Sequence, residues 1–156
     1  MKIPLSQLSI LMLLSLIFGG CKKDNTSPST TSLTKTELLV KYTWQIDEVF
    51  RNSAGKNSHY VKSGVNTTGT TYNLVRITFK ADGTASYTND LGQTYPATWK
   101  FTSADEHNME LAITSSANVV YSWNMVEISD RSFSNTTAIT SGGSDVLVVA
   151  RYIPFP

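Results

Sequence analysis

The strongest constraint on the fold is an alternation of apolar and polar residues from Val75 to Phe101, interrupted at two points. Side chains on a strand alternate between its two faces, so the apolar residues form one row on each of three short segments. Asp82-Gly83 and residues 89–92 separate these segments and contain the residue types that accept the positive φ of tight turns. The stretch therefore predicts three antiparallel strands joined by two hairpin turns.

The same alternation continues before and after this stretch. Residues 44–50 predict a first strand with a bulge near Val49, where the alternation breaks. A second break, between Trp123 and Val126, predicts another bulge or a strong bend. Segments of this kind recur at roughly 8–12-residue spacing with turn signals between them, which is typical of an antiparallel sandwich or barrel. Residues 52–71 remain undecided between a short strand and a long loop.

Sequential hairpins favour one of these two architectures. An up-and-down barrel pairs each strand with the next and removes the exposed sheet edges. We therefore expect an all-β domain, an antiparallel up-and-down barrel of about eight strands, preceded by a short helix. Thr34 and Glu37 have the spacing of a capping box and predict that helix through Leu38 and Leu39. The last strand, 146–152, is apolar on both faces, so we expect the helix to cover its outer face.

Charge excludes some classes of partner. Thirteen basic and twelve acidic residues give a formal net charge of +1, and only 16% of the residues are charged. Such a chain has no strong field to attract a polyanion, so we expect no nucleic-acid partner. Cys21 is the only cysteine, so a disulfide within a monomer is impossible. We expect a monomer whose core alone stabilises the fold.

The N-terminus has the pattern of an export signal. Lys2 precedes an apolar run over residues 8–18, which is too short to span a bilayer, since spanning needs about 20 residues. Gly19-Gly20 then places two small residues before Cys21, as bacterial lipoprotein processing requires. We expect residues 1–20 to be a lipoprotein signal peptide and Cys21 to carry fatty acyl chains such as palmitate. The alternative is an ordinary signal peptide cut nearby.

The chain after Cys21 divides into a spacer and a domain. Residues 21–34 are rich in Ser and Thr and contain one large apolar residue, so they predict a flexible tether. Residues 35–156 form the predicted barrel. The Cys-Lys-Lys-Asp start is similar to lipoproteins of the Bacteroidetes, which implies an outer-membrane anchor facing either the periplasm or the cell surface.

Four short motifs follow one another in the domain. They are Leu-Leu-x-x-x-x-Trp (Leu38, Leu39, Trp44), Phe-x-x-Asp-Gly-Thr (Phe79, Asp82, Gly83, Thr84), Trp-x-Phe (Trp99, Phe101) and Met-x-Leu (Met109, Leu111). This combination resembles the lipocalin-like domains carried by Bacteroidetes lipoproteins, over about residues 35–152. The resemblance implies a lipocalin-like (calycin) barrel and a lipid anchor, but no agreed function.

The candidate binding residues are the bulky aromatics expected inside the barrel. They are Trp44, Phe79, Tyr87, Tyr95, Trp99, Phe101 and Trp123. An eight-stranded barrel is just wide enough to be filled by side chains or to hold one small ligand. Side chains of this size favour a filled interior, and a ligand cavity remains the alternative. Buried tyrosine hydroxyls and indole N–H groups need partners, which a ligand or water could supply.

Catalytic and metal chemistry has little support in the sequence. His107 and Glu110 lie close in sequence, but metal sites need three or four ligands and no third is near. Asp47 and Glu48 are adjacent on a predicted strand, so we expect them to face opposite ways. We therefore expect no enzyme, no cofactor and no metal. The favoured function is a lipid-anchored protein that binds a small apolar or amphipathic ligand. The alternatives are a filled barrel that presents loops such as 64–71 to an envelope protein and, last, an enzyme or enzyme inhibitor.

Overall fold

Nine antiparallel strands and one short helix make up the part of the chain that the structure describes, residues 32–114, 118–141 and 144–156 of a computed structural model. In chain order they are α1 (Lys35–Val40), β1 (Thr43–Ser53), β2 (Lys56–Val61), β3 (Arg76–Phe79), β4 (Thr84–Thr88), β5 (Thr94–Phe101), β6 (Met109–Ile113), β7 (Val119–Ile128), β8 (Phe133–Ser141) and β9 (Ser144–Pro154). The predicted signal peptide and Cys21 lie outside the described residues.

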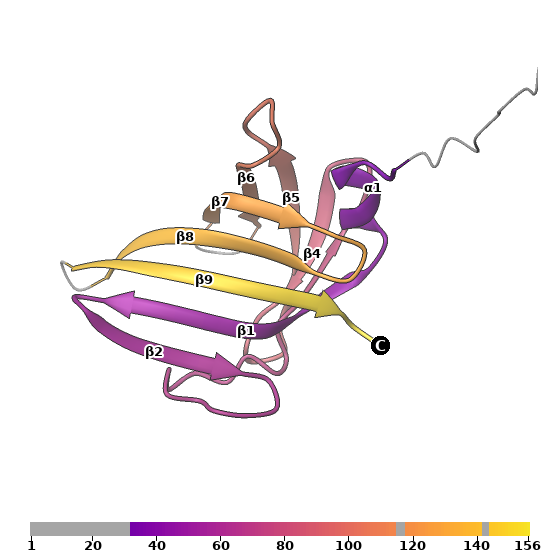
Figure 1. Ribbon diagram of the computed structural model, residues 1–156. Coiled ribbons are helices and arrows are strands. Elements are labelled where there is room, and N and C mark those ends of the chain that lie inside the picture. The colour runs from indigo at the N-terminus through magenta and orange to yellow at the C-terminus, as the bar shows by residue number, and fades with distance from the viewer. Residues whose placement is uncertain (1–31, 115–117, 142–143) are drawn as a thin grey trace, which may run out of the picture. The chain divides into compact units, whose positions relative to one another are not determined.

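The strands close into a barrel, as the sequence predicts. From β3 to β9 each strand pairs with the next, and β1 pairs with both β3 and β9, so eight strands form a ring. The β1–β9 ladder is long, extending from the Trp44–Pro154 pair to the Ser53–Val146 pair. The ninth strand, β2, pairs with Glu48–Ser53 of β1, beyond the three residues of β1 that pair with β3. Figure 1 shows β1, β2, β8 and β9 as long neighbouring strands.

The stretch from Val75 to Phe101 forms the predicted pair of hairpins. β3, β4 and β5 pair antiparallel in sequence order. The two turns contain Gly83 at φ 83° and Gly92 at φ 80°, values that a side chain would disfavour. The undecided region contains a strand at β2, followed by an irregular segment in which Tyr60 pairs with Asn66 in an isolated bridge.

Both predicted bulges are present. The β1–β9 register shifts between Ile46 and Glu48, and the β7–β8 register shifts between Asn124 and Glu127. A bulge adds one residue to one strand, which returns the next apolar side chain to the same face. As a result Val49 and Val126 are buried despite the break in alternation.

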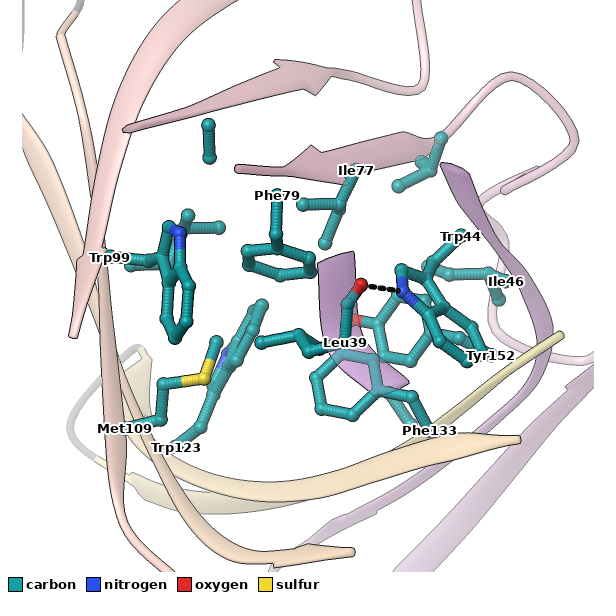
Figure 2. Packing of buried hydrophobic residues seen from close by; sticks show 14 of the residues in the cluster. Leu39, Trp44, Ile46, Ile77, Phe79, Trp99, Met109, Trp123, Phe133 and Tyr152 are labelled. Carbon is teal, nitrogen blue, oxygen red and sulfur yellow. Dashed lines mark hydrogen bonds between the residues drawn. The ribbon is translucent and has the colours of Figure 1, made fainter. Parts of the chain in front are cut away.

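Helix α1 closes one end of the barrel. Its capping box is formed as predicted, with the Glu37 amide donating to Thr34 Oγ1 at 3.2 Å and Glu37 Oε2 accepting from the Thr34 amide at 2.8 Å. The Leu39 side chain is fully buried, and its carbonyl accepts a hydrogen bond from Trp44 Nε1 at 2.7 Å (Figure 2). Outside the barrel, Lys41 Nζ lies 2.5 Å from Asp130 Oδ1. The helix is therefore held to the barrel end from inside and outside.

The expectation that this helix covers the outer face of the last strand is wrong. α1 contacts β3 and β7, and the outward side chains Leu147 and Val149 of β9 are 45% and 37% exposed. Only two residues separate α1 from the start of β1, so the helix stays at the end of the barrel where β1 begins. Apolar residues on both faces of β9 thus do not indicate that a second layer covers this strand.

Aromatic side chains fill the barrel next to α1. Phe79 lies with its ring centroid 5.6 Å from that of Trp99, 6.5 Å from Trp123 and 6.0 Å from Phe133. Phe133 also stacks on Tyr152 at 4.8 Å, and Figure 2 shows these rings around Leu39. Edge-to-face pairs of this kind contribute about 0.5–1.5 kcal/mol beyond the burial of their area. This end of the barrel is a packed core.

Candidate functional site

A cavity of about 310 Å³ lies inside the barrel, towards the end opposite α1. Its walls come from β1, β4, β7, β8 and β9 and from residues 72–75, which precede β3. The β1–β2 turn lies at this end, away from α1 and the C-terminus (Figure 1). The interior is thus filled at one end and hollow at the other, so each of the two sequence-based alternatives describes half of the barrel.

The cavity exists because the inward side chains of β8 and β9 become smaller towards the open end. On β8 the inward row changes from Phe133 to Asn135 and Thr137, and on β9 it changes from Tyr152 to Ala150. Asn135 and Ala150 are direct partners across the ladder, so the two small residues lie side by side. Beyond this pair, the residues of β8 and β9 that line the cavity are Thr137, Ile139 and Val148, none of them aromatic.

Tyrosines form much of the remaining wall. Tyr72, Tyr87, Tyr121 and Tyr152 all line the cavity. Tyr87 and Tyr121 approach each other across it, with ring centroids 6.3 Å apart. Tyr72 packs edge-on against Tyr60 at 5.1 Å, and the Tyr60 hydroxyl donates to Asn73 Oδ1 at 2.5 Å, which ties β2 to the segment before β3.

Two of the cavity tyrosines, Tyr87 and Tyr152, have a raised pKa and remain protonated at physiological pH. Burial raises the pKa of the Tyr87 phenol, and the neighbouring Tyr121 phenol adds to the increase. Burial also raises the pKa of Tyr152 to about 12. A phenol that stays protonated offers an O–H group to a ligand oxygen and an apolar ring to a ligand carbon skeleton. The wall is therefore suited to an amphipathic molecule.

Besides the tyrosines, four polar side chains line the cavity, namely Arg51, Asp90, Asn135 and Thr137. Asn135 is 3% exposed, and its Nδ2 atom has no hydrogen-bond partner among the described residues. Arg51 lies nearer the open end, because it pairs with Val148 of β9, whereas Asn135 pairs with Ala150. Arg51 is half-buried and lines the cavity. An amide deep in the cavity and a guanidinium nearer its mouth make one wall polar over its whole depth.

Two of the seven aromatics predicted to bind a ligand, Tyr87 and Trp123, line this cavity. The others belong to the packed core or lie against it, and none of them lines the cavity. They are Trp44, Phe79, Tyr95, Trp99 and Phe101. The alternation in the sequence places all seven side chains inside the barrel. It does not give the position of each side chain along the barrel axis, and this position decides whether the residue lies in the core or in the cavity.

Sequence reasoning missed the polar half of the site. Phe133-x-Asn135-x-Thr137 alternates like the apolar rows, so the signal for an inward Asn135 is present in the sequence. Arg51 follows Val49 at the strand period once the bulge at residues 46–48 is allowed for. A search of the sequence for rows of apolar residues does not identify either side chain, because both are polar.

Asp47 and Glu48 also differ from the prediction that they face opposite ways. The bulge in β1 brings both carboxylates to Arg151, whose Nη2 lies 2.8 Å from Asp47 Oδ2 and 3.4 Å from Glu48 Oε2. Glu48 Oε1 is 2.6 Å from His59 Nε2. Arg151 is about half exposed, and exposed ion pairs contribute only about 0–1 kcal/mol each. This cluster is therefore an ordinary charged surface beside the bulge.

The comparisons with known proteins assign no family to the chain. A scan against models of known protein families gives no match, and no curated protein matches the sequence. Within residues 32–114, 118–141 and 144–156, no three His, Cys, Asp or Glu side chains are grouped to hold a metal ion. Over the same ranges, no helix has the length and apolar character to cross a membrane. The cavity is the feature on which a functional proposal can be built.

Proposed function

We propose that the domain is a binding module that takes one small amphipathic molecule into the cavity at the open end of the barrel. The observation that carries this proposal is a hollow of about 310 Å³ with a polar wall, inside a barrel that is otherwise packed. Ligand pockets usually measure about 300–1,000 Å³, and this one has room for about ten water molecules. The ligand is therefore small, of the size of a substituted ring or a short chain.

The composition of the walls supports an amphipathic ligand over a purely apolar one. Trp123, Ile46 and Val49 offer apolar surface, whereas Asn135 and Arg51 offer donors at two depths. A purely apolar ligand would leave the amide desolvated without a partner, which costs about 1–3 kcal/mol. A binding role rather than a catalytic one fits this arrangement, because Asn135 and Arg51 lie at different depths of the cavity, where they can contact different parts of one ligand.

The alternative is a filled barrel that presents loops such as 64–71 to a protein of the envelope. That function would not need a hollow interior, so the cavity favours the ligand. Packing in native cores normally leaves few voids larger than a water molecule. A space of this size, open to solvent at one end of the barrel, is suited to an occupant.

The test compares two phenylalanine substitutions on one strand. Ala150→Phe places a ring in the cavity, whereas Val149→Phe places the same ring on the outer face. We expect native mass spectrometry of the protein from the cells that make it to show a bound small molecule. That molecule should be present in wild type and in Val149→Phe and absent from Ala150→Phe.

Two results would contradict the binding proposal. One is a wild-type protein that carries no small molecule and shows no chemical-shift change with any small aromatic or acyl probe. The other is a ligand that stays bound to Ala150→Phe. A stoichiometric protein partner in the same spectra would instead support the loop-presenting alternative. Thermal unfolding of both variants controls for loss of the fold.

We propose further that the domain is lipid-anchored, as a lipocalin-like lipoprotein of the Bacteroidetes type in the outer membrane. Support comes from the sequence, namely the short apolar run and the two glycines before Cys21. Replacing Cys21 with Ser should release the protein into the soluble fraction, because the acyl chains attach to the thiol. If the variant stays with the membrane fraction, the anchor proposal fails. Val149→Phe serves as the control, since it leaves the N-terminus intact.

A further inference from the structure

We propose that Asn135 selects the ligand by donating a hydrogen bond to an uncharged acceptor atom at the end of the molecule that enters the cavity first. This inference rests on the proposed binding function and adds the chemical class of the ligand. It predicts a ring or short chain with a leading carbonyl, ester or ether oxygen, not a plain hydrocarbon and not a leading carboxylate.

The unpaired amide is the observation behind this inference. Asn135 is 3% exposed, lines the cavity, and has an Nδ2 atom without a partner in the described ranges. A primary amide nitrogen carries two donors, and burying it unpaired is unfavourable. An apolar side chain at this position would pack against Ala150 without that penalty. The Tyr152 phenol lies near enough for Asn135 to lower its pKa in part, against the larger effect of burial, but no hydrogen bond joins the two side chains. An acceptor that enters from outside would give the amide a full partner.

The surroundings of Asn135 decide which acceptor fits. The floor next to it is aromatic, with Phe133 and Tyr152 stacked at 4.8 Å. The cation of the cavity, Arg51, lies one inward position nearer the mouth, beside Val148. A carboxylate at the depth of Asn135 would lose its hydration without a cation beside it, and burying a charge in this way is strongly unfavourable. A neutral oxygen needs only the donor that Asn135 provides.

The acceptor has two possible sources, an ordered water in the empty cavity or the ligand itself. The relative affinities of two matched probe molecules distinguish these two sources. Acetophenone has a carbonyl oxygen where isopropylbenzene, which has the same shape, has a methyl group. If the amide meets the ligand directly, the carbonyl compound binds more tightly. If a retained water satisfies the amide, the two compounds bind alike.

The experiment titrates the full chain with both probes and follows chemical shifts in amide correlation spectra. We expect wild type to bind acetophenone about tenfold more tightly than isopropylbenzene, as one net hydrogen bond allows. Asn135→Leu should abolish this preference. Asn124→Leu is the matched control, since Asn124 is exposed on the outer face of β7, and it should keep the preference. Asn135→Ala repeats the test without adding bulk.

The possible results distinguish a failure of the role of Asn135 from a failure of the binding function. Equal binding of both probes to wild type, or a preference that survives in Asn135→Leu and Asn135→Ala, would overturn the role of Asn135 while leaving the binding function in place. Failure of both probes to shift any cavity residue would overturn the binding function itself. A melting temperature of ligand-free Asn135→Leu below that of wild type would also count against an unpaired amide.

Discussion

A buried phenol at the floor of the cavity, that of Tyr152, makes the stability of the domain depend on pH in alkaline solution. Tyr152 is 5% exposed and stacks on Phe133 between the packed core and the hollow. Its phenol loses water contacts on folding, and this burial raises its pKa to about 12, against an ordinary value of 10.0. The difference between folded and unfolded pKa makes this residue a reporter of stability in alkaline solution.

We expect the free energy of unfolding to decrease between pH 10 and 12. Below pH 10 the phenol is protonated in both states, so the whole contribution is present. Above pH 10 the unfolded chain releases the proton while the folded chain retains it, so stability is lost as the pH rises towards 12. For Tyr152 the loss amounts to roughly 2–3 kcal/mol.

Urea unfolding at a series of pH values measures this loss. Tyr152→Phe should make the decrease shallower, and Tyr87, whose pKa burial also raises, should account for part of what remains. Parallel curves for wild type and Tyr152→Phe would show that the phenol is not desolvated in solution.

At the scale of the element, the two bulges keep the apolar side chains of β1 and β7 inside the barrel although the alternation along each strand is broken. In β7 the extra residue is Met125, which has φ 51° and is 68% exposed. A side chain in the left-handed region costs roughly 1–2 kcal/mol relative to the usual backbone conformation. Met125 therefore has a strained backbone conformation, and its exposed side chain gains little burial to offset that strain.

Replacing Met125 with Gly should raise the free energy of unfolding by about 1 kcal/mol, because glycine adopts positive φ without a steric penalty. Glu127→Gly, two residues along the same strand, should lower it by about 0.5–1 kcal/mol through the ordinary entropic cost of glycine in a strand. Equilibrium denaturation measures both. If the two variants lose stability alike, the bulge is not strained.

Elements with local signals were predictable, and arrangements that depend on distant pairing were not. The hairpins between Val75 and Phe101 follow from alternation and glycine turns, and the bulges follow from slips in alternation. That α1 lies at the end of the barrel and not over the outer face of β9 was not predictable, because the two elements are far apart in the sequence. The cavity was not predictable either, since it requires Asn135 of β8 to meet Ala150 of β9, a register that no single segment contains.

The whole barrel has two unlike ends. The chain enters the domain at Leu33 beside α1, and the Phe155 amide donates to the Thr43 carbonyl at 2.7 Å, so the C-terminus leaves at this packed end too. The β1–β2 turn lies at the other end, where the cavity is. Closure of the ring joins the first barrel strand to the last.

This polarity matters to anyone who grafts the protein onto a bead, an electrode or a fluorescent fusion. A linker joined just before α1, at Leu33, or at the C-terminus attaches at the packed end, so the mouth of the cavity at the other end stays open to solutes. The same linker inserted in the β1–β2 turn, at residues 54–55, would lie near that mouth and slow the exchange of solutes.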